Sequence, residues 1–364
     1  HLLTTLLLIL HSRTSKLSMV RFAPLNVPLH RRAQTAAMCL VVFAPYILLG
    51  LFVAVCALFG PLWFVPALAY SAYLAYDWHA PRRGGHRPWL RTLSRPFFRV
   101  VSSYFPSQLV RWSEKEGSSS QLEETVKQFD SSQRYFFAVV PHGFIGIGVW
   151  CSFISDGNGF SRLFPGVRLR CLTLAMNFVL PFWRDYLLGL GMVDCSRASI
   201  RHAFARNLSL MVVPGGAREA LYARPSDEVT LLIKRRKGFV KCALESGAHL
   251  VPCFGFGEQE AYDQVWNPEG SRLRAFQDFL LKKLTIAFPL VHGRGVFNYS
   301  FGWLPFRVPL TMVVGDPIQV EMTAHPTDEQ IDKLHERFVS ELIKLFENNK
   351  HKYGYGHQKL KFIE

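Results

Sequence analysis

A long run without charge near the N-terminus constrains the fold of this chain more than any other feature. No Asp, Glu, Lys or Arg occurs among the 41 residues from Ala36 to Tyr76. Because about 20 helical residues cross the apolar core of a bilayer, the run has room for two crossings or for a re-entrant pair. Gly60-Pro61 lies past its middle and predicts a bend there. We expect a transmembrane helical hairpin over residues 36–76; the alternative is a buried helix pair inside a soluble core.

Basic residues flank this hairpin on both sides, and none lies within it. Positively charged residues are enriched in the cytosolic loops of membrane proteins. The pattern therefore places both ends of the hairpin, and with them both termini, on the cytosolic side. The flanking residues are Arg31 and Arg32 before the run and Arg82, Arg83 and Arg87 after it.

The first 18 residues begin with His1 and are rich in leucine. They lack the basic start and the small-residue cleavage site of a secretory signal. We interpret residues 1–18 as a non-native N-terminal extension, with Met19 as the natural start. Residues 19–35 then form a cytosolic segment that leads into the hairpin.

Composition limits the classes of partner. The formal net charge of +15 favours a polyanion, which can be nucleic acid, an anionic membrane face or a phosphate-rich carrier such as coenzyme A. The basic residues are scattered and form no zinc-finger, basic-zipper or RNA-recognition pattern, so we exclude nucleic acid. The seven cysteines form no CxxC pair, which predicts reduced thiols, with neither a metal site nor a disulfide scaffold.

After the hairpin, strand-like apolar runs alternate with helical ones. We interpret residues 77–134 as a membrane-proximal linker with helices, 135–350 as one α/β domain and 351–364 as a loosely held basic tail. Such alternation predicts a mixed sheet flanked by helices, with the chemistry at strand ends. The predicted strands are 136–140, 170–175, 208–213, 249–257 and 309–320; the predicted helices are one late in 114–134, one after Gly143, 199–207, 238–246 and one that starts with the capping box Thr327-Asp328-Glu329-Gln330.

Three loops at the ends of predicted strands carry the candidate chemistry. The first is PHG, in which His142 follows Pro141 directly after a buried strand. Imidazole titrates close to neutral pH, so His142 is a candidate general base. Gly143 removes the side chain that would crowd its approach. A turn with a structural histidine is the alternative.

The other two loops complement this base. In PGGARE (214–219), Gly215 and Gly216 can point backbone N–H groups into one concavity, as an oxyanion hole requires. In KRRKGFVK (234–241), cations stand at the start of a helix, whose dipole also favours phosphate. An ordinary tight turn and a solvated run of charge are the alternatives. A general base, a turn that binds an oxyanion and a segment that binds phosphate together suit the transfer of a group from a phosphate-bearing carrier.

With these blocks identified, the chain resembles the diacylglycerol acyltransferase type-2 family, which includes monoacylglycerol and wax-alcohol acyltransferases. The resemblance runs from about Met19 to Gly354. The blocks that carry it are FAPLNVPLHRRAQT (22–35), YDWHAPRRGG (76–85), YFP (104–106), PHG (141–143), FPG (164–166), RDYL (184–187), PGGAREAL (214–221), RKGFVKCALESGAHLVPCFGFGE (236–258), GRGVFNYSFGWLPFR (293–307) and VVGDPI (313–318).

The resemblance implies a glycerolipid-acyltransferase-like fold and an endoplasmic-reticulum membrane enzyme that also reaches lipid droplets. It implies transfer of a fatty acyl group from acyl-CoA, which is a substrate and not a cofactor, to the hydroxyl of monoacylglycerol or diacylglycerol. In its sequence blocks the chain resembles the 2-acylglycerol O-acyltransferase branch most. A wax-alcohol or retinol O-acyltransferase is the first alternative. A non-catalytic lipid-binding or droplet-organising membrane protein is the second. Homo-oligomerisation stays open.

The family's His-Pro-His-Gly motif maps onto residues 140–143. His142 matches the second histidine and is the implied base. Val140 departs from the usual His or Glu, and we interpret the first position as one that packs or tunes the site. The orienting carboxylate is expected at Glu219, with Glu258 as the alternative. The expected oxyanion and turn residues are Pro141, Gly143, Gly215 and Gly216, and the expected acyl-CoA contacts are Arg236, Lys237, Gly238, Phe239 and Lys241. A covalent acyl-enzyme on Cys151 or Cys171 is disfavoured, since neither has a base beside it in sequence.

Overall fold

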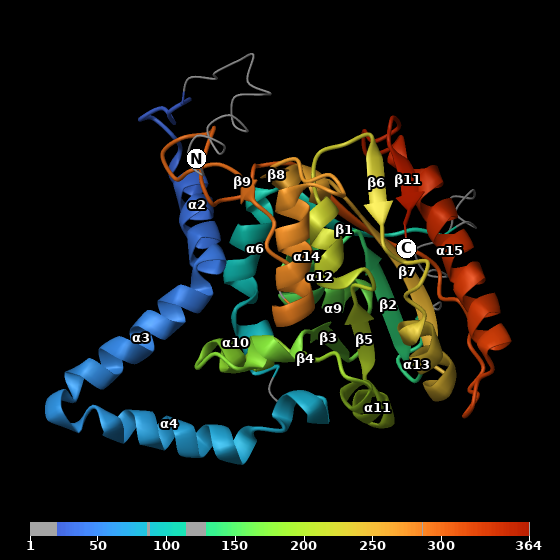
Figure 1. Ribbon diagram of the computed structural model, residues 1–364, viewed down its shortest axis with the longest axis horizontal. Coiled ribbons are helices and arrows are strands. Elements are labelled where there is room, and N and C mark those ends of the chain that lie inside the picture. The colour runs from blue at the N-terminus through green and yellow to red at the C-terminus, as the bar shows by residue number, and fades with distance from the viewer. Residues whose placement is uncertain (1–19, 86–87, 114–128, 286, 364) are drawn as a thin grey trace.

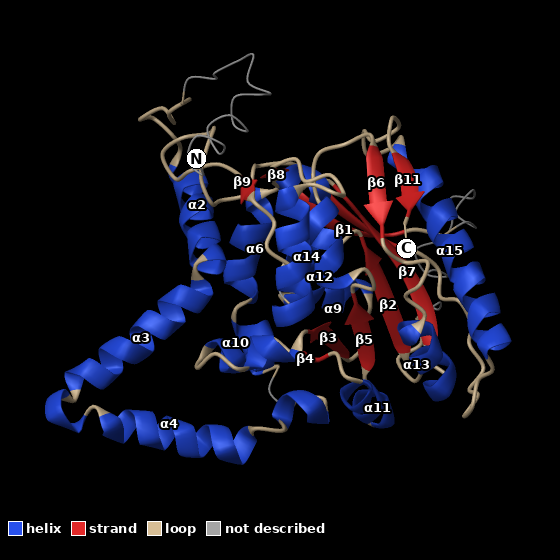
Figure 2. Cartoon of the chain, viewed as in Figure 1, coloured by secondary structure: helices blue, strands red, loops and turns tan. Residues whose placement is uncertain are grey.

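A seven-stranded mixed sheet runs through the body of the protein, with helices on both sides of it (Figures 1 and 2). The computed structural model describes residues 20–85, 88–113, 129–285 and 287–363. Neighbouring strands are parallel except β10 and β7, which are antiparallel. In spatial order the strands are β1 (Ser107–Arg111), β10 (Leu310–Val314), β7 (His249–Phe256), β2 (Tyr135–Val140), β5 (Ser209–Val212), β3 (Leu169–Thr173) and β4 (Met192–Asp194).

The central strand β2 brings the candidate loops together. It pairs in parallel with β5 on one side and with β7 on the other. Because the carboxyl ends of parallel strands meet at one edge of a sheet, the loops after β2, β5 and β7 lie side by side. All six residues of β2 are buried, and their side chains alternate between two cores. Tyr135, Phe137 and Val139 face one core; Phe136, Ala138 and Val140 face the other.

Helices close both cores. The core of Phe136 is covered by α11 (Arg197–Ala205), α13 (Gly238–Ser246) and α15 (Asp328–Lys350). The predicted capping box begins α15: the Thr327 hydroxyl accepts from the Gln330 N–H, and the Gln330 side chain accepts from the Thr327 N–H. The other core is covered by α2 (Leu29–Val42), α6 (Arg95–Tyr104) and a π-helical turn (Trp150–Ile154). The remaining helices of the body are α5 (Trp89–Leu93), α8 (Ile147–Val149), α9 (Phe160–Leu163), α10 (Trp183–Gly189), α12 (Gly216–Glu219) and α14 (Arg272–Leu284).

An apolar arm of helices projects from this body (Figure 1). After α2 (Leu29–Val42), α3 (Ala44–Leu58) leads away from the body and α4 (Phe64–Asp77) leads back. The two part at the turn Gly60–Leu62, which confirms the predicted bend. Among the described residues, no single helix has both the length and the apolarity of a bilayer span; α2 and α3 together meet that standard but are bent by 71°.

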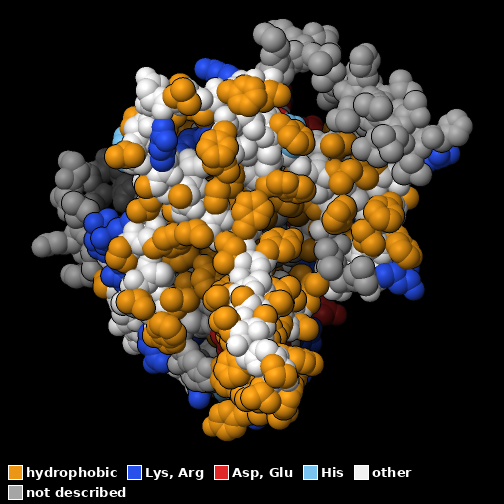
Figure 3. Space-filling model, turned by 90° about the vertical axis from the view of Figure 1, so that its left-hand side faces the viewer, with side chains coloured by type: hydrophobic (Ala, Val, Ile, Leu, Met, Phe, Trp, Pro, Cys, Tyr) orange, Lys and Arg blue, Asp and Glu red, His pale blue; other side chains and the backbone are white. Residues whose placement is uncertain are grey.

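Hydrophobic side chains cover much of the side from which the arm projects (Figure 3). Ala44 is the one residue of α3 that is buried. The large apolar side chains exposed along the arm are Tyr46, Ile47, Leu49, Leu51, Val53, Leu58, Phe59, Leu62, Trp63, Phe64, Val65, Leu68 and Tyr76. An apolar surface of this extent is unusual for a protein surrounded by water alone.

The returning helix α4 is fastened to α10 by a partly buried polar cluster, which we call the arm latch. Arg184, 1% exposed, donates from Nη1 to Asp77 Oδ2 at 3.0 Å. The hydroxyls of Tyr70 and Tyr73 donate to the two Asp185 oxygens at 2.5 and 2.6 Å. Removing one partner from a buried ion pair strands the other charge, so the latch fixes where the arm rejoins the body.

The five predicted strands are present as β2, β3, β5, β7 and β10, and residues 238–246 form α13 as predicted. The prediction of a loosely held tail is wrong. Residues Lys359–Phe362 form β11, parallel to β6 (Glu228–Leu231), because Leu360 and Phe362 alternate along the tail and pack against the core. The predicted extension 1–18 and most of 114–134 lie outside the described residues.

Candidate active site

His142 stands in the loop that follows β2, where its main chain and its ring have separate partners. The His142 N–H donates to Glu219 Oε1 at 2.6 Å. Its ring Nδ1 lies 3.1 Å from the Gly143 carbonyl oxygen, and an Nδ1–H donor there leaves the Nε2 lone pair available to a substrate. Burial lowers the pKa of His142, so the imidazole is neutral near pH 7. A neutral imidazole is the form that a general base requires.

Glu219, in the glycine loop, is hydrogen-bonded to the histidine loop and to the main chain just before the basic segment. It lies at the end of α12, in the glycine loop, and is 2% exposed. Besides the His142 N–H, its carboxylate accepts the Leu232 N–H at 2.9 Å through Oε2, just before the basic segment 234–241. Burial raises the pKa of Glu219 to about 7, although the two N–H donors and the nearby Arg236 act in the opposite direction. The carboxylate binds the backbone N–H of His142, and within the described residues it forms no hydrogen bond with the His142 ring.

Glu258 holds the same loop from the side of β7. It is 3% exposed and accepts the N–H groups of Ile147 and Gly148 at 2.7 Å each. Burial is also the main reason why its pKa is raised to about 7. Its side chain fills the space beside Gly143: a Cβ there would lie 2.5 Å from Glu258 Cγ, and φ is +63°. Gly143 therefore allows the Glu258 carboxylate to approach the loop next to His142.

The glycine pair has the backbone form that the sequence predicted, but one of its donors is used. Gly215 has φ −62° and Gly216 has φ +62°, the alternation that turns successive N–H groups toward one side. The Gly216 N–H donates to the Val213 carbonyl at 3.2 Å. A Cβ on Gly215 would overlap the Glu219 carboxylate. The pair thus serves first to let Glu219 fold back over its own loop.

The predicted acyl-CoA residues fall into two groups. Arg236 is exposed, and it lies close enough to Glu219 to affect the pKa of that carboxyl. Gly238 is exposed at the start of α13, and Lys241 is half-buried. Lys237 forms an ion pair of 2.5 Å with Asp332 on α15. Phe239 is 7% exposed and packs against Phe136 and Phe338, so its contacts are those of a core residue.

An apolar cavity of about 660 Å³ lies beyond the histidine loop. Three residues that follow His142 line it, Phe144, Ile145 and Ile147, so the loop continues directly into the cavity wall. Its volume is within the range of small-molecule and lipid sites. The other lining residues are Met38, Val41, Val42, Phe43, Pro45 and Tyr46 from α2 and α3, and Phe98, Val101, Trp150, Cys151, Trp183, Tyr262 and Trp303 from the body.

Cys151 and Cys171 are both buried. Burial raises the pKa of Cys151 and of Cys171 to about 12, so neither is a ready nucleophile at neutral pH. Within the described ranges, no three His, Cys, Asp or Glu side chains gather as a metal site requires.

Val140 is fully buried in the core of Phe136, which agrees with a packing role for the first motif position.

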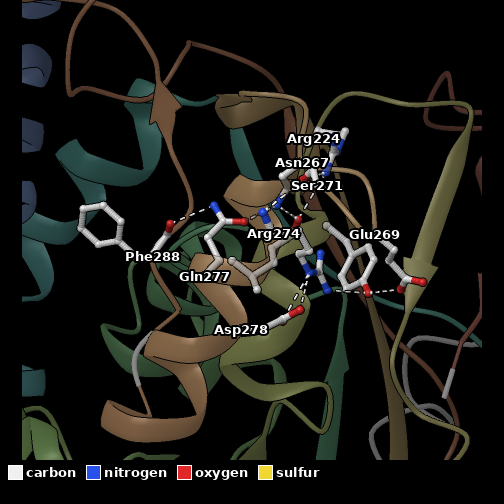
Figure 4. Close-up of polar contacts among 10 residues, drawn as sticks. Arg224, Asn267, Glu269, Ser271, Arg274, Gln277, Asp278 and Phe288 are labelled. Carbon is white, nitrogen blue, oxygen red and sulfur yellow. Dashed lines mark hydrogen bonds and ion pairs between the residues drawn. The ribbon is translucent and has the colours of Figure 1, made fainter. Parts of the chain in front are cut away.

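Sequence reasoning missed a polar network that joins α14 to the segment after Glu219 (Figure 4). Arg274, 2% exposed, lies 4.3 Å from the ring centre of Tyr222 and donates to its hydroxyl at 2.6 Å. Tyr222 ends the short helix that begins directly after Glu219. The Asn267 amide donates to Gln277 Oε1 at 2.7 Å and to a carbonyl of the same short helix at 3.2 Å. These residues are scattered through the sequence and belong to no motif, so only their burial reveals them.

A family model described as diacylglycerol acyltransferase matches residues 55–362. The chain belongs to the diacylglycerol acyltransferase family. The 2-acylglycerol O-acyltransferase 1 of Bos taurus is 41% identical over 343 residues, which cover 92% of this chain and 96% of that protein. The diacylglycerol O-acyltransferase 2A of Umbelopsis ramanniana is 37% identical over 352 residues and covers 94% of both chains.

Among solved structures, the 1-acyl-sn-glycerophosphate acyltransferase PlsC from Thermotoga maritima covers 71% of this chain and 79% of its own. Its TM-score of 0.38 and 14% identity make this likeness too distant to carry an argument. The resemblance predicted from the sequence blocks is confirmed by the family match, and membership in the diacylglycerol acyltransferase family makes the chain an acyltransferase.

Proposed function

We propose that the chain transfers a fatty acyl group from acyl-CoA to the hydroxyl of monoacylglycerol or diacylglycerol, with His142 as the base. One observation carries the proposal. A single buried carboxylate, Glu219 in the glycine loop, accepts hydrogen bonds from the histidine loop and from Leu232, two residues before the basic segment, and an apolar cavity adjoins that site. The names of the matched relatives support both acceptors, each of which joins a hydroxyl to an apolar body.

In the proposed reaction, Nε2 of His142 takes the proton of the acceptor hydroxyl as its oxygen attacks the thioester carbonyl. The C–S bond then breaks, and the coenzyme A thiolate takes the proton from the imidazolium. The new ester and free coenzyme A are the products. The lowered pKa of His142 supports the first step, because the ring is neutral when the acceptor arrives.

The oxyanion that forms during attack needs backbone donors. Within the described part of the chain, the N–H groups of Gly143 and Gly215 donate to no other residue, whereas the Gly216 N–H is already bonded. We assign the oxyanion to the Gly143 and Gly215 donors. One preorganised donor of this kind is worth about 3–4 kcal/mol of transition-state stabilisation.

The coenzyme A phosphates are assigned to the basic segment before α13. Lys234, Arg235 and Arg236 are exposed there, and Arg236 lies near Glu219. The acyl chain is assigned to the apolar cavity, whose wall begins two residues after His142. Bound acyl-CoA would then extend across the edge of the sheet, with its phosphates beside the basic segment and its acyl chain in the apolar cavity.

The arm is proposed to enter a membrane as a hairpin with cytosolic ends, and the endoplasmic reticulum and lipid droplets are the proposed locations. The uncharged run and the exposed apolar side chains of α3 and α4 support this placement. A neutral glycerolipid dissolves in such a membrane, and residues of α3, the first helix of the arm, line the apolar cavity.

The test uses microsomes from cells that lack their own neutral-lipid synthesis and express the chain from Met19. Labelled oleoyl-CoA is offered with 2-monoacylglycerol, diacylglycerol or a long-chain alcohol. We expect label in di- or triacylglycerol that falls at least about 100-fold in His142→Ala, since a general base contributes on that order. The matched control is His325→Ala, because His325 is an exposed histidine outside the site.

Three results would contradict the proposal in different ways. Transfer only to the alcohol would make the chain a wax-ester synthase. Activity that survives in His142→Ala would move the base to another residue. No transfer with any acceptor, from a protein that is folded and present in the microsomes, would favour a lipid-binding role.

A further inference from the structure

A second cavity, of about 1490 Å³, lies at the N-terminal end of α2. Its walls come from residues 22–36 and 294–309, with Pro106 between them. We call it the arginine cavity, because four arginines line it. They are Arg31, Arg32, Arg294 and Arg307. Among the described residues that form its lining, none is Asp or Glu.

The charge of Arg307 is surrounded by neutral groups. Its guanidinium donates to Gln34 Oε1 at 2.7 Å, to Thr35 Oγ1 at 2.9 Å and to the Arg31 carbonyl at 3.0 Å. It also lies 3.9 Å from the ring centre of Tyr104. These contacts satisfy its N–H groups and fasten α2 to the body, but none of them supplies a negative charge.

Arg294 repeats this arrangement. It is 6% exposed, its Nε donates to the Gly295 carbonyl at 3.1 Å, and it lies 4.5 Å from the ring centre of Tyr299. Burial lowers the pKa of Arg307, and the like charges of Arg294 and Arg31 lower it further. Buried and partly buried charges that repel one another raise the free energy of the fold, and an anion placed among them removes that penalty.

The same cavity has apolar walls. Phe22, Leu25 and Phe297 line it and are 74%, 94% and 79% exposed. Positive charge beside exposed apolar side chains suits an amphiphile with an anionic head. Helix α2 also links this cavity to the site, since residues 31–36 of the helix line the arginine cavity, whereas Met38 and Val41, further along, line the apolar cavity.

We propose that the arginine cavity binds the phosphate headgroup of an anionic phospholipid, whose chains lie along the apolar walls. This inference rests on the proposed membrane placement of the arm, which would bring such lipids to α2. Coenzyme A carries the same phosphate chemistry. The phospholipid is favoured because the basic segment 234–241 leads into α13, which covers one core of the sheet, whereas α2 covers the opposite core.

The test is lipid retention on the purified full chain in neutral detergent, followed by native mass spectrometry. Dioleoyl phosphatidic acid, dioleoyl phosphatidylcholine and dioleoylglycerol are offered in equal amounts. We expect phosphatidic acid to be retained at least about tenfold over phosphatidylcholine. Arg31→Gln, which removes an exposed charge, should lower this preference about fivefold, as one basic residue contributes near an anionic lipid.

Two variants of Arg307 separate charge from structure, and a third variant is the control. Arg307→Lys keeps the charge and loses the forked hydrogen bonds, whereas Arg307→Gln loses both, so the Lys variant should retain more phosphatidic acid than the Gln variant. Arg162→Gln removes an exposed arginine on α9 and should leave the preference unchanged. Equal retention of all three lipids by the unaltered chain, or equal losses in Arg31→Gln and Arg162→Gln, would overturn the proposal.

The remaining parts of the test identify which ligand supplies the phosphate. They also separate lipid binding in the arginine cavity from acyl transfer. Displacement of phosphatidic acid by coenzyme A, abolished in Arg31→Gln, would assign the cavity to coenzyme A and overturn the phospholipid site. Normal acyl transfer without lipid preference would refute this site alone. Lipid preference without acyl transfer to any acceptor would refute the proposed function and keep the site.

Discussion

Glu219 and Glu258 are two buried carboxylates of the same kind that hold different parts of one loop. Each accepts two backbone N–H groups, and burial raises the pKa of each to about 7. Glu219 bonds the N–H of His142 itself, whereas Glu258 bonds the first residues of α8, where Ile147 lines the apolar cavity. The chemistry of the two is alike, so their place beside β2 decides what each controls.

The difference teaches that a positioning carboxylate need not touch the ring it positions. Glu219 binds the main chain of His142, the proposed base, and the main chain of Leu232, two residues before the basic segment. Glu258 reaches the wall of the cavity and fills the space that Gly143 leaves. We therefore expect Glu219 to govern the rate of the chemical step and Glu258 to govern how the acyl chain binds.

Among the changes that test this comparison, the largest effect is expected for Gly143→Ala, at the residue that follows His142 and lies against the Glu258 side chain. The new Cβ would lie 2.5 Å from Glu258 Cγ at a backbone φ of +63°, so the loop must shift. A displacement of about 1 Å costs about 100-fold in rate. Acyl transfer in microsomes measures it. Gly270→Ala is the matched control, because Gly270 has φ +83° and open space around it. Equal losses in both variants would attribute the effect to backbone strain alone.

Glu219→Gln is expected to lower kcat about tenfold while the KM for acyl-CoA changes little. The amide keeps the shape but opposes one N–H donor with its own NH₂ group, so His142 loses its fixed position. Initial rates at varied acyl-CoA separate the two constants. A rise in KM without a fall in kcat would show that Glu219 acts on binding instead.

Glu258→Gln is expected to have the opposite signature, with a KM for long-chain acyl-CoA raised by less than tenfold and kcat nearly kept. Its carboxylate anchors α8 and thereby Ile147 in the cavity wall. A series of acyl chain lengths tests this, since the change should be greatest for chains that fill the cavity. An equal change at every length would separate Glu258 from the acyl chain.

The smallest effect is expected in the way thermal stability depends on pH. Each carboxyl has an ordinary pKa of 4.5 and a pKa of about 7 in the folded protein, so the native state binds more protons between these values. The free energy of unfolding should fall as pH rises from 4.5 to 7 and level off above that. Melting curves in detergent should show a weaker pH dependence in each Glu→Gln variant. An unchanged dependence in both would rule out these carboxyls as its cause.

Much of this site was predictable from residues near one another in sequence. The buried run before His142 predicts the strand, and the glycines after it predict the turn, because both are local patterns. Glu219 was also predictable as a partner of the base. That it bonds the main chain was not, since this depends on β5 lying next to β2. The network of Arg274 and the strand formed by the tail depend on contacts between distant segments, which periodicity alone does not encode.

The arm is fastened at both ends, by the hydrogen bonds of Arg307 to α2 and by the arm latch at α4. At about 1.5 Å per residue, the 15 residues of α3 reach about 22 Å, less than the hydrocarbon thickness of about 30 Å. In the proposed membrane placement, an arm with fixed ends and fixed length would set the height of His142 above the lipid around the tip of the arm. A membrane of another thickness, or a droplet with a single lipid layer, would then have His142 at the same height above it.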